Sequence, residues 1–148
     1  MDKTAERLRP EPDREPKTQY AALPWRRTPA GVEVLLITSR ETKRWVIPKG
    51  WPIKKLKPPA SAAQEAMEEA GVAGPTSRKA IGVYHYDKRL RSGRTQHVRV
   101  LVFALEVAEL KDAWPEQHQR ERRWATPAEA AGLVDEKELK KLLAGFAP

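Results

Sequence analysis

The sequence contains no cysteine, which excludes disulfide bonds and thiolate-bound zinc and fits a reducing compartment. It also lacks long apolar runs. The longest uninterrupted run, Val100–Leu105, is far too short to span a bilayer, and no apolar segment near the N-terminus has the character of a signal peptide. We therefore expect a cytoplasmic protein that has no membrane partner.

Acidic residues are outnumbered, with 20 Asp and Glu against 28 Lys and Arg, which gives a net charge of +8. Residues 1–17 contain five basic and five acidic residues, three prolines and little that could be buried. We expect this segment to be a disordered tail. The remaining residues, 18–148, are enough for one domain with a single core, and they carry the whole excess of positive charge.

The positive charge is concentrated in two segments. Residues 40–57 hold seven basic residues and one acid, and residues 88–99 hold five basic residues and no acid. Such clusters favour a small-molecule substrate that carries several phosphates. Nucleic acid is the competing polyanion, but the few aromatic residues in these segments form no obvious platform for base stacking.

Three carboxylates stand between the two basic segments on an expected helix. Glu65, Glu68 and Glu69 share one stripe of that helix, and Ala66 and Ala70 lie on the opposite face. Like charges at this spacing repel each other, and Glu68 and Glu69 lie in the last turn, where the helix dipole disfavours anions. A solvated acidic face is the alternative interpretation. The cationic segment before the helix favours a Mg²⁺ or Mn²⁺ site that binds a phosphorylated substrate.

The 23 residues from Gly50 to Val72 resemble the signature of the Nudix hydrolases, G-x5-E-x7-R-E-U-x-E-E-x-G-U, in which U is an aliphatic residue. The matching residues are Gly50, Glu65, Ala66, Glu68, Glu69, Gly71 and Val72. Leu56 and Gln64 replace the glutamate and the arginine of the signature. In the family these two residues brace the loop against the helix, so the resemblance implies that the joint change is a replaced brace.

The resemblance also implies roles for individual residues. Glu65 and Glu69 would hold the metal together with a backbone carbonyl of Lys49 or Gly50, and Glu68 would activate the attacking water. The residues expected to bind substrate phosphates are Ser39, Arg40, Arg120 and Arg122.

The pattern along the chain fits the α/β/α sandwich with a mixed sheet that the resemblance implies. Strands are expected at residues 20–27, 32–39, 44–48, 81–86 and 98–107. The signature helix should begin at about Pro59, or slightly later if Ser61 and Gln64 form a capping box. Gly71 should end it with a left-handed stop. Further helices should begin with capping boxes at Thr126 and Asp135.

Three segments, 36–40, 45–50 and 120–124, are similar to the branch of the family that cleaves diphosphoinositol polyphosphates and dinucleoside polyphosphates. This resemblance implies a metal-dependent hydrolase that cleaves a phosphoanhydride bond in one of these substrates. The alternative is a nucleotide or RNA binding module that kept the fold and lost turnover. The sequence gives no prediction of oligomeric state.

Overall fold

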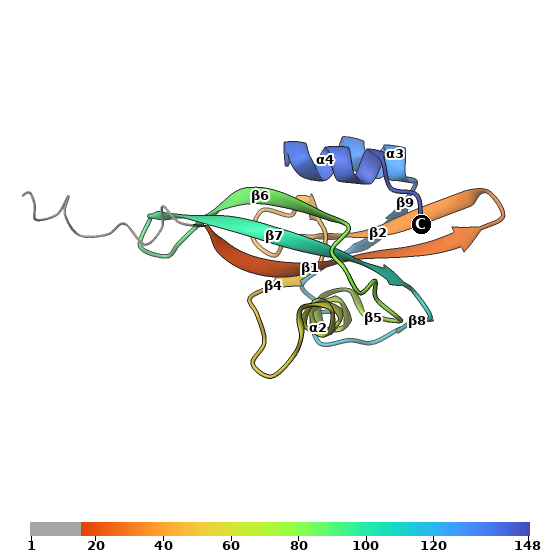
Figure 1. Cartoon of the computed structure of the whole chain (residues 1–148), viewed down its shortest axis with the longest axis horizontal. Coiled ribbons are helices and arrows are strands. Elements are labelled where there is room, and N and C mark those ends of the chain that lie inside the picture. Colours follow the sequence, from red (N-terminus) through yellow and green to blue (C-terminus); the bar gives the residue numbers. More distant parts are fainter. Residues whose placement is uncertain (1–15) are drawn as a thin grey trace, which may run out of the picture.

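The computed structural model describes residues 16–148. It is an α/β/α sandwich in which helix α2 covers one face of a mixed sheet and helices α3 and α4 cover the other (Figure 1). This architecture confirms the predicted fold class. Most of the predicted tail lies outside the described residues, and its last residue, Lys17, is the first residue of strand β1.

The main sheet has seven strands, and its central order is β3-β2-β1-β7-β6. Strands β1 and β7 run parallel, and the other strand pairs are antiparallel. These strands are β1 (Lys17–Thr28), β2 (Gly31–Thr38), β3 (Trp45–Val46), β4 (Lys49–Gly50), β6 (Gly82–Arg89), β7 (Thr95–Glu106) and β9 (Arg122–Ala125). The two short strands of a second sheet are β5 (Val72–Ala73) and β8 (Glu109–Leu110). The helices are α2 (Pro58–Ala70), α3 (Pro127–Leu133) and α4 (Lys137–Ala144).

Helix α2 packs on the sheet through small side chains. Ala62, Ala66 and Ala70 are fully buried and form one core cluster with residues of β2 and β7. Alanines at this spacing allow close approach of helix and sheet. Glu69 is also buried, so the acidic stripe is not separated from the packed face as the sequence pattern predicted. The structure therefore places one carboxylate of the stripe against the sheet.

The ends of α2 differ from one another. Gly71 follows the helix with φ of 68°, which confirms the predicted left-handed stop. At the other end the helix begins at Pro58 and Lys57 provides no side-chain cap. The alternative start with a Ser61–Gln64 capping box is wrong, because Ser61 is a buried residue inside the helix.

The two C-terminal helices also begin in different ways. Thr126 and Glu129 form the predicted capping box of α3. The capping box predicted at Asp135 is wrong, since α4 begins at Lys137 and has no side-chain cap. Glu138 instead accepts a hydrogen bond from the backbone N–H of His85 at 2.8 Å. No helix in the described part of the chain is long and apolar enough to cross a membrane, and the cytoplasmic location stays a prediction.

Candidate active site

The C-terminal end of α2 is fixed by the segment that runs from β8 to the first residue of β9. Three consecutive carbonyls that the helix leaves unpaired each accept a hydrogen bond from this segment. The Glu68 carbonyl accepts from the backbone N–H of Glu116 at 3.0 Å, and the Glu69 carbonyl accepts from the indole N–H of Trp114 at 3.0 Å. The Ala70 carbonyl accepts from the guanidinium of Arg122 at 3.2 Å. These contacts set the position of the glutamates in the last turn.

Glu69 is the most deeply placed of the three signature carboxylates, with only 7% of its surface exposed. Its Oε1 atom accepts a hydrogen bond from the backbone N–H of Lys49 at 3.3 Å and lies 3.7 Å from the guanidinium of Arg120. Arg120 in turn donates from Nε to Glu116 at 2.8 Å and from Nη1 to the Thr38 carbonyl at 3.0 Å. The buried carboxylate is therefore tied to β4 on one side and to a positioned arginine on the other.

Burial is the main cause of the pKa shifts of the charged groups in this site. Burial raises the pKa of Glu69, although the charges of Arg120 and Lys49 act against it. The pKa of Glu65 is also raised, chiefly by burial, and Glu69 is one of the neighbouring groups that act on it. The pKa of the Lys49 ammonium is lowered by burial, against the attraction of Glu69. Two neighbouring carboxyls whose pKa values are raised by burial form a site where a cation can replace protons.

The backbone before the helix lies directly against Glu65. A Cβ atom at Gly50 would overlap the Glu65 carboxylate, so only glycine allows β4 to approach it this closely. The donors available here are carboxylate and backbone oxygens, which suit Mg²⁺ or Mn²⁺. No three His, Cys, Asp or Glu side chains of residues 16–148 form a ready-made cluster for a metal. A carboxylate pair still fits Mg²⁺, because this ion is usually held by one or two carboxylates together with waters and substrate phosphates.

Most of the predicted site residues line one cleft of about 670 Å³. The cleft opens between the β3–β4 segment, helix α2 and the outer end of β6. Its lining includes Ser39, Arg40, Lys49, Gly50, Glu65, Glu69 and Arg120. The two basic segments seen in the sequence therefore meet here, because Lys88 and Arg89 also line this cleft.

The side chains in the cleft that are predicted to bind phosphate differ in how many hydrogen bonds they already make. Arg40 is exposed and makes one long hydrogen bond, of 3.3 Å, to Gln119. Ser39 closes a local turn, where its hydroxyl accepts from the backbone N–H of Arg44 and lies 2.7 Å from the hydroxyl of Thr42. Arg40 therefore has a guanidinium that can turn toward a phosphate, whereas Ser39 already uses its oxygen.

Glu68 and Arg122 do not line the cleft. The Glu68 carboxylate accepts a hydrogen bond from the amide of Gln64 at 2.7 Å. Arg122 donates to the carbonyls of Ala70 and Lys111, and its guanidinium lies 3.8 Å from the ring centre of Trp114. Their predicted roles, water activation and phosphate binding, stay predictions. For Arg122 the contacts indicate that it positions the end of the helix.

The loop between Gly50 and the helix is braced by a residue that sequence reasoning missed. The Ile53 N–H donates to the buried hydroxyl of Ser61 at 3.1 Å. Leu56 and Gln64, the two departures from the signature, are both exposed, so a buried contact between them is not what holds the loop. Trp51 and Glu116, which also line the cleft, were missed as well. The only sequence feature that could have drawn attention to Glu116 is its place in the segment Trp114-Pro115-Glu116.

Comparisons with known proteins show the family of this chain. The profile of the NUDIX domain family matches residues 17–146. Nudix hydrolase 13, mitochondrial, of Arabidopsis thaliana is 36% identical over 121 residues, which are 78% of this chain and 59% of that protein. Diphosphoinositol polyphosphate phosphohydrolase 3-alpha of Mus musculus is 32% identical over 125 residues, which are 78% of this chain and 72% of that protein.

The fold is similar to that of the C. elegans Ap4A hydrolase, with a TM-score of 0.63 and 17% identity, over 88% of this chain and 95% of that one. At this identity the likeness concerns the fold alone. The chain spans 58% and 59% of the length of two of its plant relatives. The chain belongs to the NUDIX domain family, as its signature predicted.

Proposed function

We propose that this protein is a hydrolase that cleaves a phosphoanhydride bond in a polyphosphorylated small molecule with the help of Mg²⁺ or Mn²⁺. The observation that supports this proposal is the pairing of Glu65 and Glu69 beside the Gly50 backbone, at the base of a cleft whose rim carries Arg40 and Arg89. Acidic oxygens at the base and cations at the rim provide for both a metal and a chain of phosphates.

A bound divalent ion would neutralise phosphate oxygens and make the phosphorus more open to attack by water. Glu65, Glu69 and a backbone carbonyl of Lys49 or Gly50 would hold that ion. Arg120 keeps the Glu69 carboxylate in place and balances its charge. No covalent intermediate with the protein is needed in this reaction.

Glu68 is our proposed general base, because it belongs to the same helix turn as the two metal ligands. Glu116 is the second carboxylate to test for this role, because it lines the cleft and is held by Arg120 at 2.8 Å. This pairing with Arg120 also fixes the position of the Glu116 carboxylate, as a base requires. The two candidates differ in their surroundings, since Glu68 accepts its bond from the neutral amide of Gln64.

The substrates that we propose are diphosphoinositol polyphosphates and dinucleoside polyphosphates. The name of the mouse relative supports the first class, and the resemblance carried by residues 36–40, 45–50 and 120–124 supports both. The test is a panel in which phosphate release is measured for diadenosine polyphosphates, nucleoside triphosphates, capped RNA and diphosphoinositol phosphates, each with and without Mg²⁺. Release that requires Mg²⁺ from any of them supports the proposal, and release from none contradicts it.

The alternative function is a nucleotide or RNA binding module without turnover. The exchange of the signature glutamate and arginine for Leu56 and Gln64 is the observation that favours it. Tight binding of a substrate in the panel without Mg²⁺-dependent cleavage would support this alternative.

A further inference from the structure

One tryptophan of this chain differs from the other four in its contacts within residues 16–148. All five tryptophans lie in the part that the structure describes, and four of them stack with an arginine or pack against another ring. Those four are Trp25, Trp45, Trp114 and Trp124. Trp51 makes no such contact in residues 16–148, and 41% of its surface is exposed. Burying an indole is normally favourable, so an exposed one is a candidate contact site.

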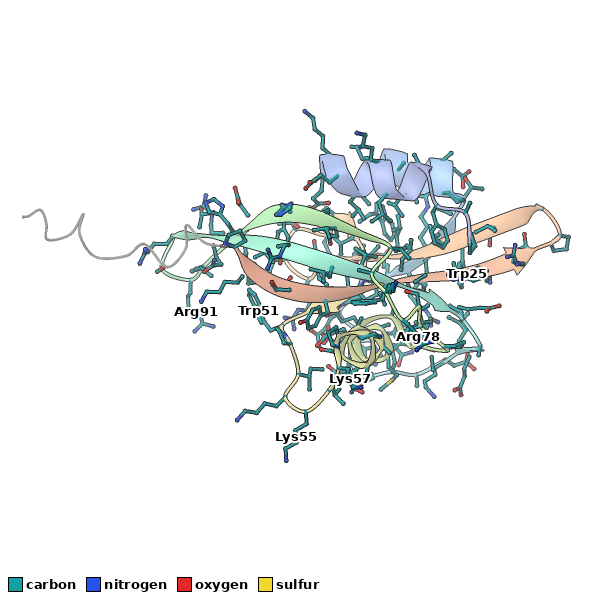
Figure 2. All side chains as sticks on the ribbon, in the orientation of Figure 1. Trp25, Trp51, Lys55, Lys57, Arg78 and Arg91 are labelled. Atoms are coloured by element: carbon teal, nitrogen blue, oxygen red, sulfur yellow. The ribbon has the colours of Figure 1, made fainter. Side chains whose placement is uncertain are left out.

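Trp51 lies at the mouth of the candidate active site. It lines the same cleft as Glu65 and Glu69 and directly follows Gly50, the residue in contact with the Glu65 carboxylate. In Figure 2 its side chain stands clear of the ribbon, whereas Lys55 points outward from the tip of the same loop. A ring at this position meets the part of a substrate that extends away from the metal-bound phosphates.

The backbone on both sides of Trp51 is fixed. Gly50 pairs with Tyr20 in the sheet, and Pro52 restricts the conformations open to the tryptophan before it. Ile53 is tied to the buried Ser61 hydroxyl at 3.1 Å. The indole is therefore exposed without belonging to a free loop, which lowers the entropy lost when it binds a flat partner.

We propose that Trp51 is a stacking platform for the nucleobase of a nucleotide whose phosphates occupy the cleft, and this inference rests on the proposed function. Bases stack on aromatic side chains without need of hydrogen bonds, which suits a rim that offers an indole face. A fully phosphorylated inositol has no flat apolar face, and it gains nothing from an indole among the cations. The inference thus favours dinucleoside polyphosphates over diphosphoinositol polyphosphates.

The test uses two matched ligands that cannot be hydrolysed, α,β-methylene-ADP and methylenediphosphonate. Both carry the same P–C–P group, and only the first carries a nucleoside. Their affinities are measured by calorimetry with Mg²⁺ for the parent chain and for Trp51→Leu, Trp51→Phe and Leu56→Ala. Leu56 is the matched control, because it belongs to the same loop, is also 41% exposed and does not line the cleft.

We expect Trp51→Leu to weaken binding of α,β-methylene-ADP by about tenfold or more, which is the range of one base stacked on an aromatic ring. Binding of methylenediphosphonate should change by less than about twofold, because this ligand has no base. Trp51→Phe should keep most of the affinity, and Leu56→Ala should resemble the parent.

Each of the following results overturns the inference. A loss below about threefold for α,β-methylene-ADP would show that the indole contributes no stacking. An equal loss for both ligands would show that Trp51 shapes the phosphate site instead. If the parent chain binds neither ligand, the proposed function fails together with the inference. If the parent binds both ligands equally and Trp51→Leu changes neither affinity, the stacking inference alone fails.

Discussion

The two ends of helix α2 are held in different ways. At its C-terminal end, three successive carbonyls accept hydrogen bonds from Glu116, Trp114 and Arg122 of a segment that is remote in sequence. At its N-terminal end there is no side-chain cap, and the described bond that ties the preceding loop to the helix runs from Ile53 to Ser61. The carboxylates proposed to hold the metal and activate water lie toward the anchored end.

This difference indicates how the fold offsets the electrostatic repulsion among the glutamates of α2. Three glutamates near a helix C-terminus repel one another and the helix dipole. The remote segment opposes this effect, because Arg122 and Arg120 bring positive charge to the last turn and to Glu69. The other end needs no such support, since the first turn of α2 carries no acidic residue.

The largest effect should follow from a change at the anchored end. Glu68→Gln should lower turnover by about 10²–10⁴-fold if Glu68 is the general base, with metal affinity unchanged. Glu69→Gln is the matched variant, and it should weaken Mg²⁺ binding in calorimetry. Glu116→Gln is measured beside them. If Glu116→Gln shows the large loss of turnover and Glu68→Gln loses less than about tenfold, the base is Glu116.

The second effect separates a positioning role from phosphate binding. Arg122→Met removes the hydrogen bonds to the carbonyls of Ala70 and Lys111, so the free energy of unfolding in urea should fall by about 2 kcal/mol. Arg123→Met is the control. Arg123 is exposed and next in sequence, and its guanidinium lies 5.8 Å from the ring centre of Trp45, so its loss should cost less than about 1 kcal/mol. Unchanged stability together with a salt-dependent rise in KM for Arg122→Met would restore the phosphate-binding role predicted from the sequence.

The third effect concerns the cleft rim, where Arg40 is exposed and weakly held. Arg40→Ala should raise KM by about tenfold at low ionic strength, since hydrogen bonds to charged groups are worth more than neutral ones. The effect should shrink as salt is added, and the melting temperature should not change. Arg78→Ala, at an exposed arginine outside the cleft, is the control. Equal KM values for both variants would remove Arg40 from the substrate site.

Patterns of neighbouring residues in the sequence correctly predicted features that depend on local interactions. The helix stop at Gly71 and the capping box at Thr126 are confirmed, because each depends on residues a few positions apart. The capping box predicted at Asp135 failed, since Glu138 bonds to His85 on a distant strand instead. A contact between elements far apart in sequence leaves no periodic signal.

The same distinction applies to the candidate site. The signature predicted the carboxylates, and the structure brings Glu65 and Glu69 together in the cleft. The tertiary contacts of Trp114 and Arg122 could not be predicted, because they depend on how the segment after β8 folds back on α2. The exposure of Trp51 also escaped prediction, since tryptophan in a sequence is more often a packing residue.

The smallest effect should come from the loosely held end, at the two departures from the family signature. Leu56 is exposed and Gln64 is bonded to Glu68, so Leu56→Glu and Gln64→Arg should each change the free energy of unfolding by less than about 0.5 kcal/mol. An exposed charged pair contributes about 0–1 kcal/mol, so the double variant should stay close to the sum of the single changes.

Ser61→Ala is the matched positive control in these urea titrations. It should cost about 1 kcal/mol, because it leaves the Ile53 N–H without its acceptor. A coupling above about 1 kcal/mol between positions 56 and 64 would contradict this expectation. It would mean that the family's charged brace can still form here and stabilise the loop more than the Ser61 hydroxyl does.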